Sequence, residues 1–271
     1  MTDLDRILQA KPEGELEVQL GPGALEQFRA QGFVRVERIT SDQEVQWLRA
    51  VYDLLFETRS AGIRGGYFDL TRRYESEGPD RLPQLLLPEK RLPELLETIF
   101  HRNGRRLAAL LLDEDPRGLE VGGHMIQKPP GGAALPWHQD EAYWDPRFDH
   151  EAIGVWMPLD DATLENGCLH FIPGSHRAGV RTHRHIDDDP SIHGLQVEGA
   201  DLSDAVAMPV RAGGALLHHC RTLHCSGPNR TRERRRAYTH EFQAAPVPRS
   251  EPADRPWIEQ TRLGWARRPG G

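Results

Sequence analysis

The chain of 271 residues is long enough for one large domain, and its 38% hydrophobic and 28% charged residues are typical of a globular protein. No apolar run approaches the roughly 18 to 20 residues needed to cross a bilayer, and a net charge of -7 argues against a general affinity for nucleic acid phosphate. These features predict no membrane and no nucleic acid partner. Three cysteines and an N-terminus without a basic and then apolar leader predict a cytoplasmic protein with reduced thiols.

We expect a single domain over residues 1–271, with a helical N-terminal part from about 22 to 112. A short helix over residues 24–29, ended by Gly32, precedes an alternating strand over 33–36. Ser41 and Glu44 have the spacing of a capping box, and apolar residues three and four apart continue that helix to about residue 59. Residues 62–80 combine glycine, proline and mixed charge and are typical of a loop. A second helical region is expected over 92–112, with a break near Asn103 and Gly104.

Beyond Gly122 short apolar segments alternate with turns, which predicts a β-sandwich or barrel over about 122–245 with the helices packed outside it. The long polar stretch 176–202 is expected to be a variable loop with solvent-facing histidines. The predicted strands cover residues 124–128, 136–141, 153–159, 168–173, 205–210, 215–220 and 237–242.

Within the second of these strands, the triplet His138-Gln139-Asp140 indicates a metal site. Successive side chains of a strand point to opposite faces, so His138 and Asp140 would project together as two of the three ligands of a facial site. A chain of this composition contains such a triplet about once by chance. A second copy, His185-Ile186-Asp187, lies in a run of charges and is interpreted as solvated loop. The first copy is flanked by aromatic residues, as expected for a strand that enters a core.

A further histidine is needed to complete the site, and the candidates are His218, His219 and His224. His224 precedes a turn that begins at Ser226, and Arg235 follows eleven residues after it. Two histidines and a carboxylate are the ligand set of non-haem iron(II) oxygenases. The planar guanidinium of Arg235 can bind a carboxylate through two hydrogen bonds, as a dicarboxylic 2-oxo acid co-substrate would require.

Three stretches then identify a family: KPPG…WHQDEAYW, VWMPLDDATLENGCLHFIPGSHR and AGGALLHHCRTLHCSGPNRTRERRRAY. Over about residues 32–242 the chain resembles the phytanoyl-CoA dioxygenase family of iron(II)- and 2-oxoglutarate-dependent oxygenases. The resemblance implies a mainly β fold, a double-stranded β-helix (a cupin-like jelly roll) with N-terminal helices packed on it. It also implies three iron ligands, His138, Asp140 and His224.

The co-substrate contacts are likewise implied by the resemblance. Arg235 and Ser226 would hold the distal carboxylate of 2-oxoglutarate, with Trp156 lining its pocket. Lys128 belongs to the KPPG motif, and His124 stands four residues before it, where relatives touch the co-substrate. Trp156 is equally explained as a core aromatic, His218 competes with His224 as third ligand, and a register shift of one residue would replace Arg235 by Arg234 or Arg236.

The activity that the resemblance implies is that of a 2-oxoglutarate-dependent non-haem iron dioxygenase (EC 1.14.11 type), which hydroxylates an unactivated C–H bond of a small organic molecule and releases succinate and CO2. Asp140 favours oxygenation over halogenation, because related halogenases replace this carboxylate with a small residue. Two other functions are compatible with the same residues: a non-catalytic cupin-like binding module and a zinc-dependent hydrolase. The substrate and the oligomeric state cannot be derived from these patterns.

Overall fold

Two antiparallel sheets form the centre of the molecule in the computed structural model, which describes residues 2–73 and 76–266. The large sheet consists, in spatial order, of β1 (Phe33–Val36), β12 (Ala215–His219), β7 (Ala152–Pro158), β14 (Arg235–Gln243), β4 (Glu120–Lys128), β3 (Pro83–Leu86) and β2 (Tyr67–Asp69). The small sheet consists of β11 (Val206–Met208), β8 (Leu169–Phe171), β13 (His224–Ser226) and β5 (Leu135–His138). Two further pairs are β9 (His183–His185) with β10 (Leu195–Val197), and β6 (Phe148–Asp149) with β15 (Val247–Pro248).

The two sheets face each other across a small apolar cluster. Trp156 and Leu216 of the large sheet pack in this cluster with Leu169 and Phe171 of the small sheet. Phe171 also stacks on Phe33 of β1, with ring centroids 4.5 Å apart. The predicted mainly β fold with a jelly-roll core is therefore confirmed.

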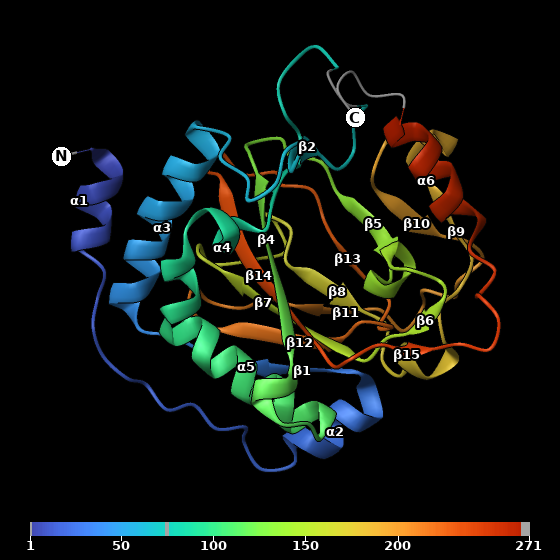
Figure 1. Ribbon diagram of the computed structural model, residues 1–271, viewed down its shortest axis with the longest axis horizontal. Helices are drawn as coiled ribbons and strands as arrows, with labels where there is room; N and C mark the ends of the chain where they lie inside the picture. Colours follow the sequence, from blue (N-terminus) through green and yellow to red (C-terminus); the bar gives the residue numbers. More distant parts are fainter. Residues whose placement is uncertain (1, 74–75, 267–271) are drawn as a thin grey trace.

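Helices cover the outer face of the large sheet, as Figure 1 shows for α3 (Asp42–Glu57) and α5 (Ile99–Leu112). The other helices are α1 (Asp3–Gln9), α2 (Ala24–Gln31), α4 (Pro88–Arg91) and α6 (Pro256–Ala266), of which α6 lies beside β9 instead. Short 3-10 helices cover Pro93–Glu97, Pro116–Gly118, Asp140–Tyr143, Ser175–Ala178 and Ile186–Asp188. Among the described residues, none of the helices is both long enough and apolar enough to traverse a bilayer.

Helix α5 runs without interruption through Asn103 and Gly104, so the predicted break at these residues is wrong. The side-chain amide of Asn103 makes tertiary contacts, because it donates hydrogen bonds to the carbonyls of Leu16 and Ile39. At Gly104, an added Cβ would lie 3.0 Å from the Phe242 ring of β14. The glycine therefore permits the close approach of helix and sheet.

Only one of the two hydrogen bonds of the predicted capping box forms at the start of α3. Ser41 Oγ accepts a hydrogen bond from the Glu44 amide, but the Glu44 side chain does not return to Ser41. Instead, its carboxylate accepts hydrogen bonds from the amides of Ile99 and Phe100 at 2.7 and 2.8 Å. Glu44 thus caps the N-terminus of α5 from a neighbouring helix, where a negative charge is favoured by the helix dipole.

Both segments expected to be loops contain strands. Residues 62–80 include β2, and residues 176–202 include β9 and β10. The expectation of solvent-facing histidines is wrong for His183 and His185, which are 3% and 2% exposed. His185 bonds to the carbonyls of Ile192 and Trp257, and the latter belongs to α6, a helix that the sequence did not predict. In the second His-x-Asp triplet, His185 is therefore a buried connection between segments, whereas Asp187 is exposed.

Candidate metal centre and co-substrate pocket

The structure brings His138, Asp140 and His224 together. His138 ends β5 and is paired with His224 at the start of β13 in the antiparallel ladder. One ligand atom of each of the three residues lies within 4.8 Å of the others. Asp140 Oδ1 lies 3.8 Å from His138 Nε2 and 3.5 Å from His224 Nε2.

Asp140 reaches this position differently from the way the sequence predicted. Strand β5 ends at His138, and Asp140 begins the 3-10 helix Asp140–Tyr143, so strand alternation does not place its carboxylate. The intervening Gln139 is extended, fully buried and held by its side-chain amide, which donates to the carbonyls of Gly179 and Arg221. The turn that follows Gln139 is thereby anchored.

The backbone fixes which ring nitrogen each histidine presents. Nδ1 of His138 lies 2.8 Å from the Pro136 carbonyl, and Nδ1 of His224 lies 2.9 Å from the Thr222 carbonyl. A carbonyl can only accept, so both Nδ1 atoms carry the proton and both Nε2 lone pairs are available to a cation. Burial lowers the pKa of both imidazoles, which keeps them in the neutral form that binds metal.

The carboxylate of Asp140 is bound on its second oxygen by another histidine. His218 Nε2 donates to Asp140 Oδ2 at 2.9 Å. His218 itself is not one of the three residues whose ligand atoms converge. Burial would raise the pKa of Asp140, but His224 and then His218 outweigh it and hold that pKa below its usual value. The donor set fits divalent iron, which is bound by two imidazoles and a carboxylate with one hemisphere open.

Arg235 and Lys128 form a second buried group between the sheets. They are cross-strand partners on β14 and β4, with 1% and 0% exposure. Lys128 donates to the Ala133 carbonyl, but Arg235 Nε and Nη1 have no hydrogen-bond partner among the described residues. Burial lowers the pKa of Arg235 to about 10, and it also lowers that of Lys128. Two buried cations without a carboxylate are costly, so this wall fits an anionic ligand.

The remaining co-substrate candidates divide between two places. The Trp156 ring lies 5.3 Å from the Arg235 guanidinium and packs in the core, so its place as a core aromatic is observed, while its role in a co-substrate pocket stays a prediction. Ser226 is buried on β13, two residues beyond His224. His124 lies elsewhere, in a pocket that Asp140 and Glu241 also line. Burial lowers the pKa of His124 to about 4, so its imidazole is neutral.

Sequence reasoning missed Thr239 and Glu241, which follow Arg235 on β14 at even spacing and so share its face. Thr239 Oγ1 is buried without a hydrogen-bond partner in the described part of the chain. Glu241 lines the same pocket as Asp140. The alternation along residues 235–241 was the signal that could have revealed both.

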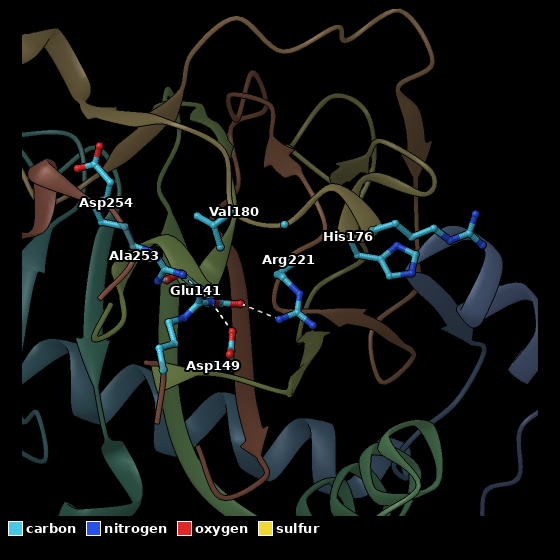
Figure 2. A pocket seen from close by; sticks show the side chains of 11 residues that line it. Glu141, Asp149, His176, Val180, Arg221, Ala253 and Asp254 are labelled. Atoms are coloured by element: carbon cyan, nitrogen blue, oxygen red, sulfur yellow. Dashed lines mark hydrogen bonds and ion pairs between the residues drawn. The ribbon is translucent and has the colours of Figure 1, made fainter. Parts of the chain in front are cut away.

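Glu141 was missed as well, although it is adjacent to Asp140. Figure 2 shows its side chain in a separate pocket of about 550 Å³, near Asp149 and Arg221. Arg255 donates to Glu141 Oε1 and to its backbone carbonyl, both at 2.6 Å, and Arg221 contacts Oε2 at 3.3 Å. This fully buried ion pair therefore anchors the 3-10 helix that carries Asp140.

The comparisons with known proteins agree with this geometry. A crystal structure of EvdO2 from Micromonospora carbonacea var. aurantiaca, complexed with 2-oxoglutarate, superposes with a TM-score of 0.78 at 40% identity, covering 90% of this chain and 99% of that one. A phytanoyl-CoA dioxygenase domain-containing protein 1 homolog of Caenorhabditis elegans is 26% identical over 87% of this chain and 94% of its own length.

A probable alpha-ketoglutarate-dependent hypophosphite dioxygenase of Stutzerimonas stutzeri is 34% identical over 122 residues. That alignment covers 44% of this chain, which spans only 42% of the relative's length. The family model described as phytanoyl-CoA dioxygenase (PhyH) matches residues 28–237, which include every candidate ligand and co-substrate contact above. The chain belongs to the phytanoyl-CoA dioxygenase family.

Proposed function

We propose that the chain is an Fe(II)- and 2-oxoglutarate-dependent dioxygenase that hydroxylates a small organic molecule. The convergence of three ligand atoms of facial type within 4.8 Å carries this proposal. It is supported by the Arg235 guanidinium in the same barrel, whose Nε and Nη1 find no partner among the described residues. The metal and the dicarboxylate co-substrate would each meet a complementary set of groups. The 2-oxoglutarate bound to the 40% identical EvdO2 supports the same co-substrate here.

In this proposal His138, Asp140 and His224 hold iron through Nε2, Oδ1 and Nε2. Arg235, with Ser226 and Lys128, binds the distal carboxylate of 2-oxoglutarate, and the Trp156 ring limits its position. When bound together with O2, iron and 2-oxoglutarate supply an oxidant that removes hydrogen from an unactivated C–H bond. The protein orients the co-substrate and excludes bulk water, since nearly all of these side chains are buried.

The test is succinate formation from 2-oxoglutarate by the full chain with Fe(II) under air. His138→Ala and Asp140→Ala should abolish it, while Asp204→Ala, an exposed carboxylate with no assigned contact, should not. Circular dichroism would verify that each variant is folded. Turnover that persists without His138, or that proceeds with zinc and without O2, would contradict the proposal and favour a hydrolase.

We further propose that the chain acts as a single domain in the cytoplasm on a small-molecule substrate, without nucleic acid or membrane partners. The three cysteines support a reducing compartment because all are free thiols, and Cys168 and Cys220 are buried. Expression in a reducing and in an oxidising compartment, followed by thiol titration, would test the location.

A further inference from the structure

Two adjoining pockets lie beside the candidate metal ligands. The first, of about 200 Å³, is lined by Asp140 and reaches Gln84, His124 and Glu241. The second, of about 260 Å³, is lined by the apolar side chains of Leu195, Trp257 and Ile258. Three residues line both pockets, namely Tyr143, Trp144 and His193.

Residues of the segment 176–202, which was expected to be a loop, hold the lining that the two pockets share. The Tyr143 and His193 rings stack with centroids 5.3 Å apart, and the Leu195 amide of β10 donates to the Tyr143 hydroxyl at 2.8 Å. On the outer side, Trp257 of α6 is 3% exposed, and its indole N–H donates to the Ala142 carbonyl at 2.8 Å. The lining that the two pockets share is therefore held in place. Each pocket is smaller than the roughly 300 Å³ of a small-ligand site, so a ligand of that size would occupy both.

The polar end of this cavity centres on Glu241. Its cross-strand neighbours are Gly122 on β4 and Gly154 on β7, so neither flanking strand places a side chain against it. The Nδ1 of the neutral His124 ring lies 3.7 Å from Glu241 Oε1, beyond hydrogen-bond distance, and the Glu241 carboxyl group accepts no hydrogen bond within residues 2–73 and 76–266. A half-buried carboxyl group that faces a pocket in this way is available to a ligand.

The formal charges in the lining of the two pockets are all negative. Among the described residues, the formally charged side chains that line the two pockets are Asp140, Asp145 and Glu241. Asp145 is paired with Arg147, and Asp140 belongs to the metal site. No Lys or Arg among the described residues lines either pocket, so an anionic group would face repulsion here, whereas a hydrogen-bond donor would be stabilised.

We propose that this cavity binds a substrate that presents a hydroxyl or amino group to Glu241 and lays an apolar body between Tyr143 and α6. The inference rests on the proposed function, because it takes the metal-proximal pocket to be the place of oxidation. It assigns Glu241 as a specificity-determining residue. It also distinguishes this chain's substrate from carboxylates and phosphorus oxyanions, which carry charge of the same sign as the Glu241 carboxylate.

The test compares three probes of similar size: phenethylamine, phenethyl alcohol and phenylacetate. Their affinities for the full chain are measured by calorimetry, once without metal and once anaerobically with Fe(II) and 2-oxoglutarate. The amine or the alcohol should bind about tenfold or more tightly than phenylacetate, which corresponds to one unit in log Kd. Because no turnover is required, this result is independent of whether the chain proves to be an oxygenase.

Variants assign the preference to Glu241. Glu241→Leu should abolish it, while Glu165→Gln, a control at an exposed carboxylate outside the cavity, should leave it unchanged. Glu241→Gln separates the two donors, since it keeps the hydrogen bond to an alcohol but loses the ion pair with an amine. The proposal is overturned if phenylacetate binds as tightly as the other probes, if the preference survives Glu241→Leu, or if none of the probes binds at millimolar concentration.

Discussion

His218 Nε2 donates a hydrogen bond to Asp140 Oδ2 at 2.9 Å, which leaves Oδ1 as the oxygen nearest to both ligand histidines. The His218 ring occupies space that Gly154 leaves open, because a Cβ at Gly154 would lie 2.6 Å from it. The pair thus fixes the orientation of a metal-binding carboxylate through a residue that does not itself join the ligand set.

Replacing His218 should weaken metal binding without removing a ligand. In His218→Leu the hydrogen bond to Oδ2 is lost and the carboxylate is free to rotate, so the affinity for Fe(II) or Co(II) should fall about 10- to 100-fold. His218→Gln, which retains a donor, should recover part of this loss. The Co(II) absorption spectrum provides the readout, and unchanged affinity in His218→Leu would refute the positioning role.

Arg235→Leu should separate stability from co-substrate binding. Since two N–H groups of the buried guanidinium have no partner in the part of the chain that the structure describes, its replacement by an apolar side chain is expected to leave the free energy of unfolding unchanged or to raise it by about 1 to 4 kcal/mol. In the unmodified chain, 2-oxoglutarate at one hundred times its Kd should raise the free energy of unfolding by about 2.7 kcal/mol and so increase Tm. The Arg235→Leu variant should lose this increase in Tm. Differential scanning fluorimetry with and without 2-oxoglutarate measures both, and a large destabilisation of the ligand-free variant would contradict this account.

Because its pKa is lowered, His101 should make the free energy of unfolding fall in mild acid. Burial and then the charges of Arg105 and Arg102 lower its pKa to about 4, against about 6.5 when unfolded. Between these values the unfolded chain binds a proton that the folded chain does not, so the free energy of unfolding decreases as pH falls from 6.5 to 4. His101→Gln should reduce that slope by up to about 1.4 kcal/mol per pH unit, as measured by urea denaturation at several pH values. An unchanged slope would show that His101 does not titrate in this way.

Glu44→Ala should destabilise the fold by about 2 to 4 kcal/mol, because it leaves the buried amides of Ile99 and Phe100 without an acceptor. Glu44→Gln keeps one acceptor and should cost less. Glu57→Ala, at the exposed end of the same helix, is the matched control and should change stability by less than about 0.5 kcal/mol. Equal losses in Glu44→Ala and Glu57→Ala would show that the cap contributes nothing.

The sequence predicted most where local patterns decide the structure. The apolar spacing of α3, the end of α2 at Gly32 and the strand expected over residues 153–159 (β7) all appear as expected. Motif resemblance brought His138, Asp140 and His224 together before any geometry was available. Strand alternation, however, gave the wrong reason for Asp140, because the chain leaves the strand at Gln139.

Tertiary contacts explain what the sequence could not predict. Glu44 has a capping-box partner three residues away, yet its carboxylate binds α5, whose N-terminus lies 55 residues further along the chain. In the sequence, His185 lies in a run of charges that is typical of a loop. In the structure it is buried by α6, where it contacts the Trp257 carbonyl. Glu241 carries no motif, and its position becomes meaningful only when the sheet places it in the pocket that Asp140 lines. His218 was a candidate ligand in the sequence, but its bond to Asp140 Oδ2 emerges only from the folded sheet.

The hydrogen bonds from Arg255 and Trp257 to the carbonyls of Glu141 and Ala142 connect the last described helix to the turn that bears Asp140. Shortening the chain ahead of Arg255, or a proteolytic cut near residue 250, would release that turn and leave the Glu141 carboxylate without its nearest cation. Truncations ahead of Arg255 should thus weaken metal binding, even though they are introduced far along the chain from the ligands themselves.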